Sequence, residues 1–124
     1  MGRYAEQVSV LYLRQKGVLL LSRNYRGPHG EIDIIGLDAD TVCFIEVRSR
    51  RHAKFADPIL TIMSKKQQRI IKTALCFLSQ NCNLNIRNYP CRFDTITLII
   101  PDDRPRELVW TKSAFQLSEQ FFNP

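Results

Sequence analysis

The sequence predicts an α/β (α+β) fold in which helices flank a mixed β-sheet. Five segments have the alternation or the branched and aromatic content of strands, and two longer segments have helical periodicity. Their order along the chain is helix, three strands, helix and two strands. A chain of 124 residues also has the usual size of one domain, so we expect a single domain over residues 1–124.

The elements follow from local signals. In the first helix apolar residues recur at helical spacing, and Gly17 is placed to end it. Two glycines and a proline make residues 26–30 a loop, and the basic residues 48–54 are expected to be partly irregular. The expected elements are a helix over 4–16, strands over 18–25, 31–37 and 41–48, a helix over 59–79, strands over 92–100 and 107–112, and a short closing helix over 113–122.

The helix expected over residues 59–79 has the clearest amphipathic pattern. Its apolar stripe and its basic edge lie on opposite sides. The stripe is formed by Ile70, Ala74, Phe77 and Leu78, and the basic edge by Lys65, Arg69 and Lys72.

Composition and charge narrow the class of protein. The hydrophobic fraction of 44% is too high for a disordered chain, and 18 basic against 12 acidic residues give a net charge of +6. That sign favours polyanionic partners. No signal peptide and no apolar run long enough for a membrane span is visible, so we expect a cytoplasmic protein without a membrane partner. The four cysteines have no CxxC spacing and are expected to be free thiols.

The candidate chemistry lies on a predicted hairpin. If Ala39 and Asp40 form a two-residue turn, Asp33 lies opposite Glu46 and Glu31 lies opposite Arg48. Cross-strand partners share a face of the sheet, as do alternate residues of one strand. The hairpin therefore has a polar face and an apolar one. The polar face comprises Glu31, Asp33, Glu46 and Arg48, and the buried face comprises Ile32, Ile34, Ile45 and Val47.

Carboxylates gathered in this way repel one another unless a cation joins them. Oxygen ligands suit Mg²⁺ or Mn²⁺, which would activate a water and stabilise a phosphate under attack. Arg48 could orient that water or neutralise the phosphate, although it cannot act as a base. The structural alternative is a solvated sheet face with a Glu/Arg ion pair across the strands.

Several motifs resemble the bacterial YraN/UPF0102 family, whose fold is similar to restriction endonucleases and Holliday-junction resolvases. The resemblance covers most of the chain, and the combination of GEID with a downstream strand carrying Glu46 is its most specific part. The matching segments are Glu6, YL at 12–13, Gly17, RNYR at 23–26, GEIDIIG at 30–36, FIEVRSR at 44–50, KQQRI at 66–70 and RFD at 92–94.

The resemblance implies the acid-acid-lysine metal site of the PD-(D/E)xK nuclease superfamily. Asp33 matches the metal-ligand aspartate and Glu46 the second acid, while Glu31 matches the extra acid of GEID. Glu6 resembles the helix glutamate of resolvase-like members, although an acid near a helix start is also favoured by the helix dipole. The expected lysine is replaced by Arg48. Some members supply it from the following helix, which here indicates Lys66.

Basic residues near these acids are candidates for phosphate contact, with a solvated charged surface as the alternative. They are Arg48, Arg50, Arg51, Lys54, Lys65 and Arg69. Other conspicuous residues are given structural roles: His29 in a turn, and Arg92 with Asp94 in an ion pair beneath the site. Trp110 and Phe115, with Phe121 and Phe122, either close the core or form a subunit contact in a homodimer.

The sequence therefore leaves two alternative predictions of function. One is a metal-dependent endonuclease that acts on DNA rather than RNA, with Asp33, Glu46, Arg48 and Lys66 as its catalytic set. The other is a catalytically impaired nucleic-acid- or protein-binding module that keeps the nuclease fold. A general protein adaptor is a third, weaker alternative.

Overall fold

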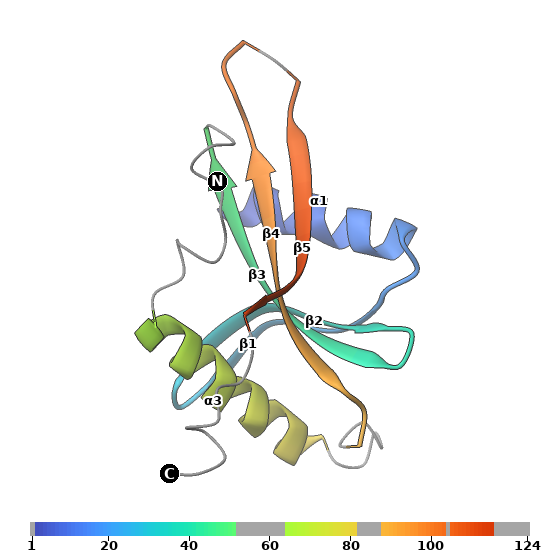
Figure 1. The fold of residues 1–124 in the computed structure, drawn as a ribbon, viewed down its shortest axis with the longest axis vertical. Coiled ribbons are helices and arrows are strands. Elements are labelled where there is room, and N and C mark those ends of the chain that lie inside the picture. Colours follow the sequence, from blue (N-terminus) through green and yellow to red (C-terminus); the bar gives the residue numbers. More distant parts are fainter. Residues whose placement is uncertain (1, 52–63, 82–87, 104, 116–124) are drawn as a thin grey trace.

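The computed structural model describes residues 2–51, 64–81, 88–103 and 105–115. These residues form a five-stranded sheet with two helices (Figure 1). The elements are α1 (Gly2–Gln15), β1 (Leu19–Gly27), β2 (Gly30–Asp38), β3 (Thr41–Arg50), α3 (Ser64–Gln80), β4 (Cys91–Ile99) and β5 (Glu107–Phe115).

The strands lie in the sheet in the order in which they occur in the chain, β1-β2-β3-β4-β5. The β3–β4 pair is parallel and the other three pairs are antiparallel. Parallel neighbours need a crossover, and α3 lies in the connection between β3 and β4. The mixed sheet with flanking helices confirms the predicted α+β fold and is consistent with a restriction-endonuclease-like core.

Helix α1 ends as the sequence predicts, at Gly17. The Val18 amide donates to the Leu13 carbonyl (2.9 Å) and the Gly17 amide to the Arg14 carbonyl (3.0 Å). These two bonds form a Schellman motif, and Gly17 has the positive φ, 85°, that the motif requires. Leu13 and Val18 are both buried, which fixes the direction in which the chain leaves α1 and enters β1.

The two helices cover opposite faces of the sheet. Cys43 and Ile45 of β3 pack in one buried cluster with Val10 and Leu13 of α1. The alternating residues of β3 pack with α3 in a second buried cluster. This cluster joins Val42 and Phe44 to Ile70, Ile71, Ala74 and Phe77. The predicted stripe of α3 is thus confirmed, with Leu78 partly buried beside it, while Lys65, Arg69 and Lys72 are exposed.

Two of the expected boundaries were wrong. The loop expected over 26–30 is shorter, because β1 extends to Gly27 and pairs with Gly30, which leaves Pro28 and His29 as the turn. The closing helix is wrong for residues 113–115, which continue β5; residues 116–122 lie outside the described residues. Residues 59–63 of the second predicted helix also lie outside them.

The aromatic residues near the C-terminus contribute to the core where they are described. Trp110 is half-buried and meets Tyr12 of α1 edge to face. Phe115 stacks on Phe93 with their ring centroids 5.1 Å apart. Phe121 and Phe122 lie outside the described residues, so the homodimer stays a prediction.

Candidate active site

The site forms where β2 and β3 separate. The predicted turn at Ala39 and Asp40 is confirmed, and the antiparallel pairs run from Asp38↔Thr41 to Ile34↔Ile45. The β2–β3 pairing ends there, while β3 remains paired with β4 as far as Arg50. Asp33 and Glu46 are adjacent to this last pair, Ile34↔Ile45, on the side away from the turn. Both acids therefore lie at the point where β2 and β3 separate, which we call the fork.

A side chain takes the place of the backbone ladder at this fork. The Val47 amide donates to Asp33 Oδ2 at 2.8 Å. Because a β2 side chain rather than a β2 carbonyl accepts this bond, the two strands are held apart by the length of that side chain. The separation opens the space into which the acids point.

A cavity of about 380 Å³ occupies the fork. Helix α1 contributes Glu6, β2 contributes Asp33 and β3 contributes Glu46. The structure thus brings together three of the four predicted metal ligands from three separate elements. The described residues that line the cavity are Ala5, Glu6, Asp33, Glu46, Val47, Arg48, Ser49 and Arg50.

Lys66 reaches the site from the first turn of α3. Its Nζ lies 3.0 Å from Glu46 Oε1, and the Glu46 side chain is only 13% exposed. A cation held this close to a largely buried carboxylate offsets part of its desolvation penalty. Lys66 therefore approaches the candidate site from α3, whereas Arg48 lies on β3 itself.

Asp33 carries the clearest electrostatic signature of the site. Burial, and then the negative charge of Glu46, raises the pKa of Asp33 to about 6. The Val47 hydrogen bond and the Lys66 ammonium act in the opposite direction without cancelling this rise. Burial and the Glu46 charge thus both disfavour the ionised form of Asp33, and a cation beside the two carboxylates would offset this cost.

Glu6 belongs to the same electrostatic group. Burial and the Asp33 charge raise the pKa of Glu6, while Asn24 and Arg23 of β1 oppose the rise. Arg23 Nη2 lies 4.0 Å from Glu6 Oε1. No local pattern predicts this role for β1, because Arg23 and Asn24 approach Glu6 only once α1 has packed against the sheet.

Glu31 does not share the predicted polar face of the hairpin with Asp33, Glu46 and Arg48. It pairs with Arg26 in the β1–β2 ladder, where its carboxylate lies 3.6 Å from Arg26 Nε, and it does not lie opposite Arg48. It does not line the cavity, although its charge contributes to the raised pKa of Asp33 and Glu6. The predicted apolar face breaks at the same point, because Ile32 packs in the α3 cluster while Ile34 packs in the α1 cluster.

A divalent metal fits these residues only with help from other ligands. Among the residues that the structure describes, no group of three or more His, Cys, Asp or Glu side chains is arranged to hold a metal ion. Mg²⁺, however, commonly binds one or two carboxylates and completes its shell with waters and substrate phosphates. Asp33 and Glu46 supply that donor set, and their mutual repulsion favours a cation between them.

Comparison with known proteins identifies the family. A family model described as "Uncharacterised protein family UPF0102" matches residues 5–98. The chain belongs to the UPF0102 family. A UPF0102 protein of Pseudomonas putida KT2440 is 43% identical over 115 residues, covering 93% of this chain and 91% of the relative. One from Pseudomonas aeruginosa LESB58 is 41% identical over 115 residues, covering 92% and 90%.

The basic residues of this UPF0102 protein lie at different distances from the cavity. Arg48 and Arg50 line it, and Arg51 lines a neighbouring cavity. Burial, and then the charge of Arg50, lowers the pKa of Arg48, which indicates a guanidinium partly withdrawn from water. Lys65 and Arg69 are exposed on α3, and Lys54 lies outside the described residues. No helix in the described part of the chain is long and apolar enough to cross a membrane.

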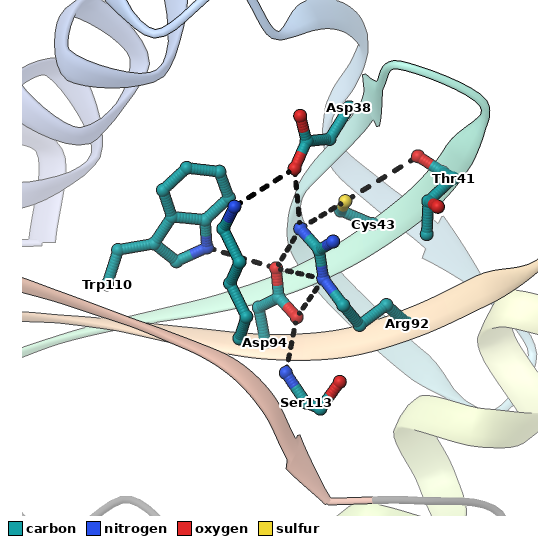
Figure 2. Close-up of polar contacts among 8 residues, drawn as sticks. Asp38, Thr41, Cys43, Arg92, Asp94, Trp110 and Ser113 are labelled. Carbon is teal, nitrogen blue, oxygen red and sulfur yellow. Dashed lines mark hydrogen bonds and ion pairs between the residues drawn. The ribbon is translucent and has the colours of Figure 1, made fainter.

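The Arg92–Asp94 ion pair exists but does not lie beneath the site. Arg92 Nε is 2.9 Å from Asp94 Oδ1, and β4 pairs these residues with Cys43 and Ile45 of β3, toward the hairpin turn from Glu46. Figure 2 shows the buried Asp94 carboxylate at the centre of several contacts. It accepts hydrogen bonds from Arg92, Trp110 Nε1 (3.0 Å) and the Ser113 amide (2.9 Å).

This network joins three strands. Arg92 also contacts Asp38 Oδ2 at 3.0 Å, at the end of β2 (Figure 2). Lys112 Nζ lies 3.4 Å from the same oxygen. A buried carboxylate with this many donors stabilises the sheet in one arrangement. Its contacts support the structural role predicted for Arg92 and Asp94.

Proposed function

We propose that this protein is a metal-dependent endonuclease that hydrolyses phosphodiester bonds in DNA. The observation that carries the proposal is the fork between β2 and β3. Asp33 and Glu46 follow directly after the last β2–β3 pair, and Lys66 Nζ lies 3.0 Å from Glu46. The raised pKa of Asp33, to about 6, supports a cation at this point.

Asp33 and Glu46 would hold Mg²⁺ or Mn²⁺, with Glu6 lining the same cavity and Glu31 adding charge from outside it. When bound, such an ion activates water and stabilises charge on a phosphate. The Val47 amide fixes the orientation of Asp33, because Asp33 Oδ2 accepts its hydrogen bond and Oδ1 takes no part in that bond. The Lys66 contact likewise uses only one oxygen of Glu46.

Two basic side chains, Lys66 and Arg48, would act on the phosphate during hydrolysis. Hydrolysis forms a bond from a water oxygen to phosphorus and breaks the bond to one ester oxygen, which takes a proton from water. Lys66 and Arg48 would orient the phosphate and stabilise its extra negative charge while both bonds are partial. Arg48 also presents a planar fork that matches phosphate oxygens.

Cleavage assays with labelled linear, single-stranded and branched DNA test the proposal. Cutting is expected with Mg²⁺ or Mn²⁺, none with EDTA, and a loss of about a hundredfold or more in Asp33→Ala. Asp40→Ala is the matched control, since Asp40 is an exposed acid at the other end of the same hairpin. Metal-independent cutting, or equal cutting by both variants, would contradict the proposal.

A second candidate is a binding module that keeps the fold without cleaving. It is favoured by Arg48 at the position of the expected lysine and by the lack of a three-donor group among the described residues. Salt-sensitive binding to DNA without cutting under any metal condition would select this candidate. If the protein neither binds DNA nor gains thermal stability from Mn²⁺, both candidates are wrong.

A further inference from the structure

A second cavity, of about 270 Å³, adjoins the site at the far end of β3. Ser49 and Arg50 line both cavities, so the two cavities adjoin the same end of β3. Arg51, which follows β3, and the β4–β5 connection also contribute to its lining. The described residues that line it are Ser49, Arg50, Arg51, Ile100 and Asp102.

Ser49, which lines both cavities, has its backbone groups on the edge of β3 that faces away from β4. Successive residues of a strand direct their backbone groups to alternate edges. The Arg50 carbonyl accepts a bond from the Ile100 amide (2.8 Å), on the β4 side, while the Val47 amide points the other way to Asp33. Ser49, two residues after Val47, therefore directs its amide and carbonyl to the same edge as Val47. Its carbonyl accepts a bond from Arg50 Nη1 at 2.8 Å.

The charge of the second cavity suits an anion. Arg50 and Arg51 bring two guanidinium groups, and among the described residues of the lining Asp102 is the one acid. Arg51 Nη1 lies 3.8 Å from Asp102 Oδ2, with side chains 70% and 81% exposed. An exposed ion pair of this kind is weak, whereas two-pronged guanidinium contacts with phosphate are strong. A phosphate would therefore displace Asp102 from Arg51.

We propose that this second cavity binds a phosphodiester of the same nucleic-acid strand whose scissile phosphate lies at Asp33 and Glu46. The inference rests on the proposed function and adds a flanking subsite to it. From Glu46 to Arg50 a strand advances about 13 Å. Roughly four stacked nucleotides span that distance. The protein should therefore distinguish DNA strands by length.

Fluorescence anisotropy in EDTA, where the strand is not cut, tests the subsite with single-stranded DNA of about ten nucleotides and with a dinucleotide. Arg51→Ala should weaken binding of the longer strand and reduce its salt slope by about 0.7, the loss of one phosphate contact. Dinucleotide binding should not change. Asp102→Asn should tighten binding of the longer strand, because it removes the competing carboxylate.

Arg14→Ala is the control, since Arg14 is an exposed cation in the last turn of α1 and lines neither cavity. Equal effects of Arg14→Ala and Arg51→Ala would overturn the subsite and leave the nuclease proposal standing. Competition by inorganic phosphate as strong as that by the longer strand would also overturn it, because the site would then recognise a free anion. If the native protein binds neither strand in EDTA but still cuts DNA with Mg²⁺ or Mn²⁺, the subsite is overturned; if it also cuts no DNA, the proposed function itself fails.

Discussion

Lys66 Nζ lies 3.0 Å from Glu46 Oε1, although Lys66 lies in the first turn of a helix and Glu46 lies within the sheet. The segment that connects them includes residues 52–63, which lie outside the described residues. The contact joins α3 to the fork between β2 and β3. It supports a helix-derived lysine at a site where β3 carries Arg48.

Replacing Lys66 tests that role. Lys66→Met should lower the single-turnover rate of DNA cleavage by about a hundredfold to a thousandfold, as expected when a group that stabilises the transition state is removed. Mn²⁺ affinity, measured by calorimetry, should be retained or increased, since a competing cation is lost from Glu46. Lys16→Met, at an exposed position that follows α1 and has no role in the site, should leave both quantities unchanged. A Lys66→Met variant that cuts at the native rate would contradict the assignment.

Asp33 should make the metal-free protein less stable as the pH rises. Its pKa is about 6 in the folded protein against 3.8 in the unfolded chain, so the folded state keeps the proton to higher pH. The stabilising contribution is complete below about 3.8 and is lost as the pH rises through about 6. Asp33→Asn should therefore raise the melting temperature at pH 7 in EDTA by a few degrees, equivalent to roughly 1–3 kcal/mol.

Thermal unfolding between pH 3.5 and 7.5 measures this effect. The native protein should gain stability from Mn²⁺ at pH 7 and Asp33→Asn should not, because the variant lacks the charged ligand. A variant that is less stable than the native protein across the whole range would show that the Val47 contact matters more than the repulsion from Glu46.

Asp94 should be essential to the stability of the sheet and irrelevant to metal binding. Asp94→Ala removes the partner of Arg92 from a fully buried position and should lower the free energy of unfolding by roughly 3–5 kcal/mol. Asp38→Asn, at a less buried position of the same network, should cost about 1 kcal/mol. Urea denaturation measures both. A smaller loss for Asp94→Ala than for Asp38→Asn would be inconsistent with this network.

Gly36 should tolerate no side chain while Val18 is present. A Cβ atom at position 36 would lie 2.7 Å from Val18 Cγ1, closer than such atoms approach. Gly36→Ala should therefore lower the free energy of unfolding by about 1–3 kcal/mol through overpacking. Combining it with Val18→Ala should cost less than the sum of the two single changes. Strict additivity in chemical denaturation would rule out the steric explanation.

The sequence alone determined most of the fold and the residue identity of the site. The Ala39–Asp40 turn and the apolar alternation beside it were sufficient to predict the register that pairs Ile34 with Ile45. Gly17 predicted the end of α1, and the 3.6-residue period predicted which face of α3 is buried. These features depend on neighbours in the chain or on one turn, so local patterns contain them.

Only the tertiary structure decided where the pairing between β2 and β3 ends. Continued alternation predicted Glu31 opposite Arg48, but the β2–β3 pairing ends at Ile34, and Glu31 pairs with Arg26 instead. It also decided that Glu6 and Lys66, from two different helices, lie beside the acids of the sheet. The physical reason is that the packing of α1 and α3 against opposite sheet faces sets these approaches. Such packing depends on side chains far apart in the sequence, and no local period encodes it.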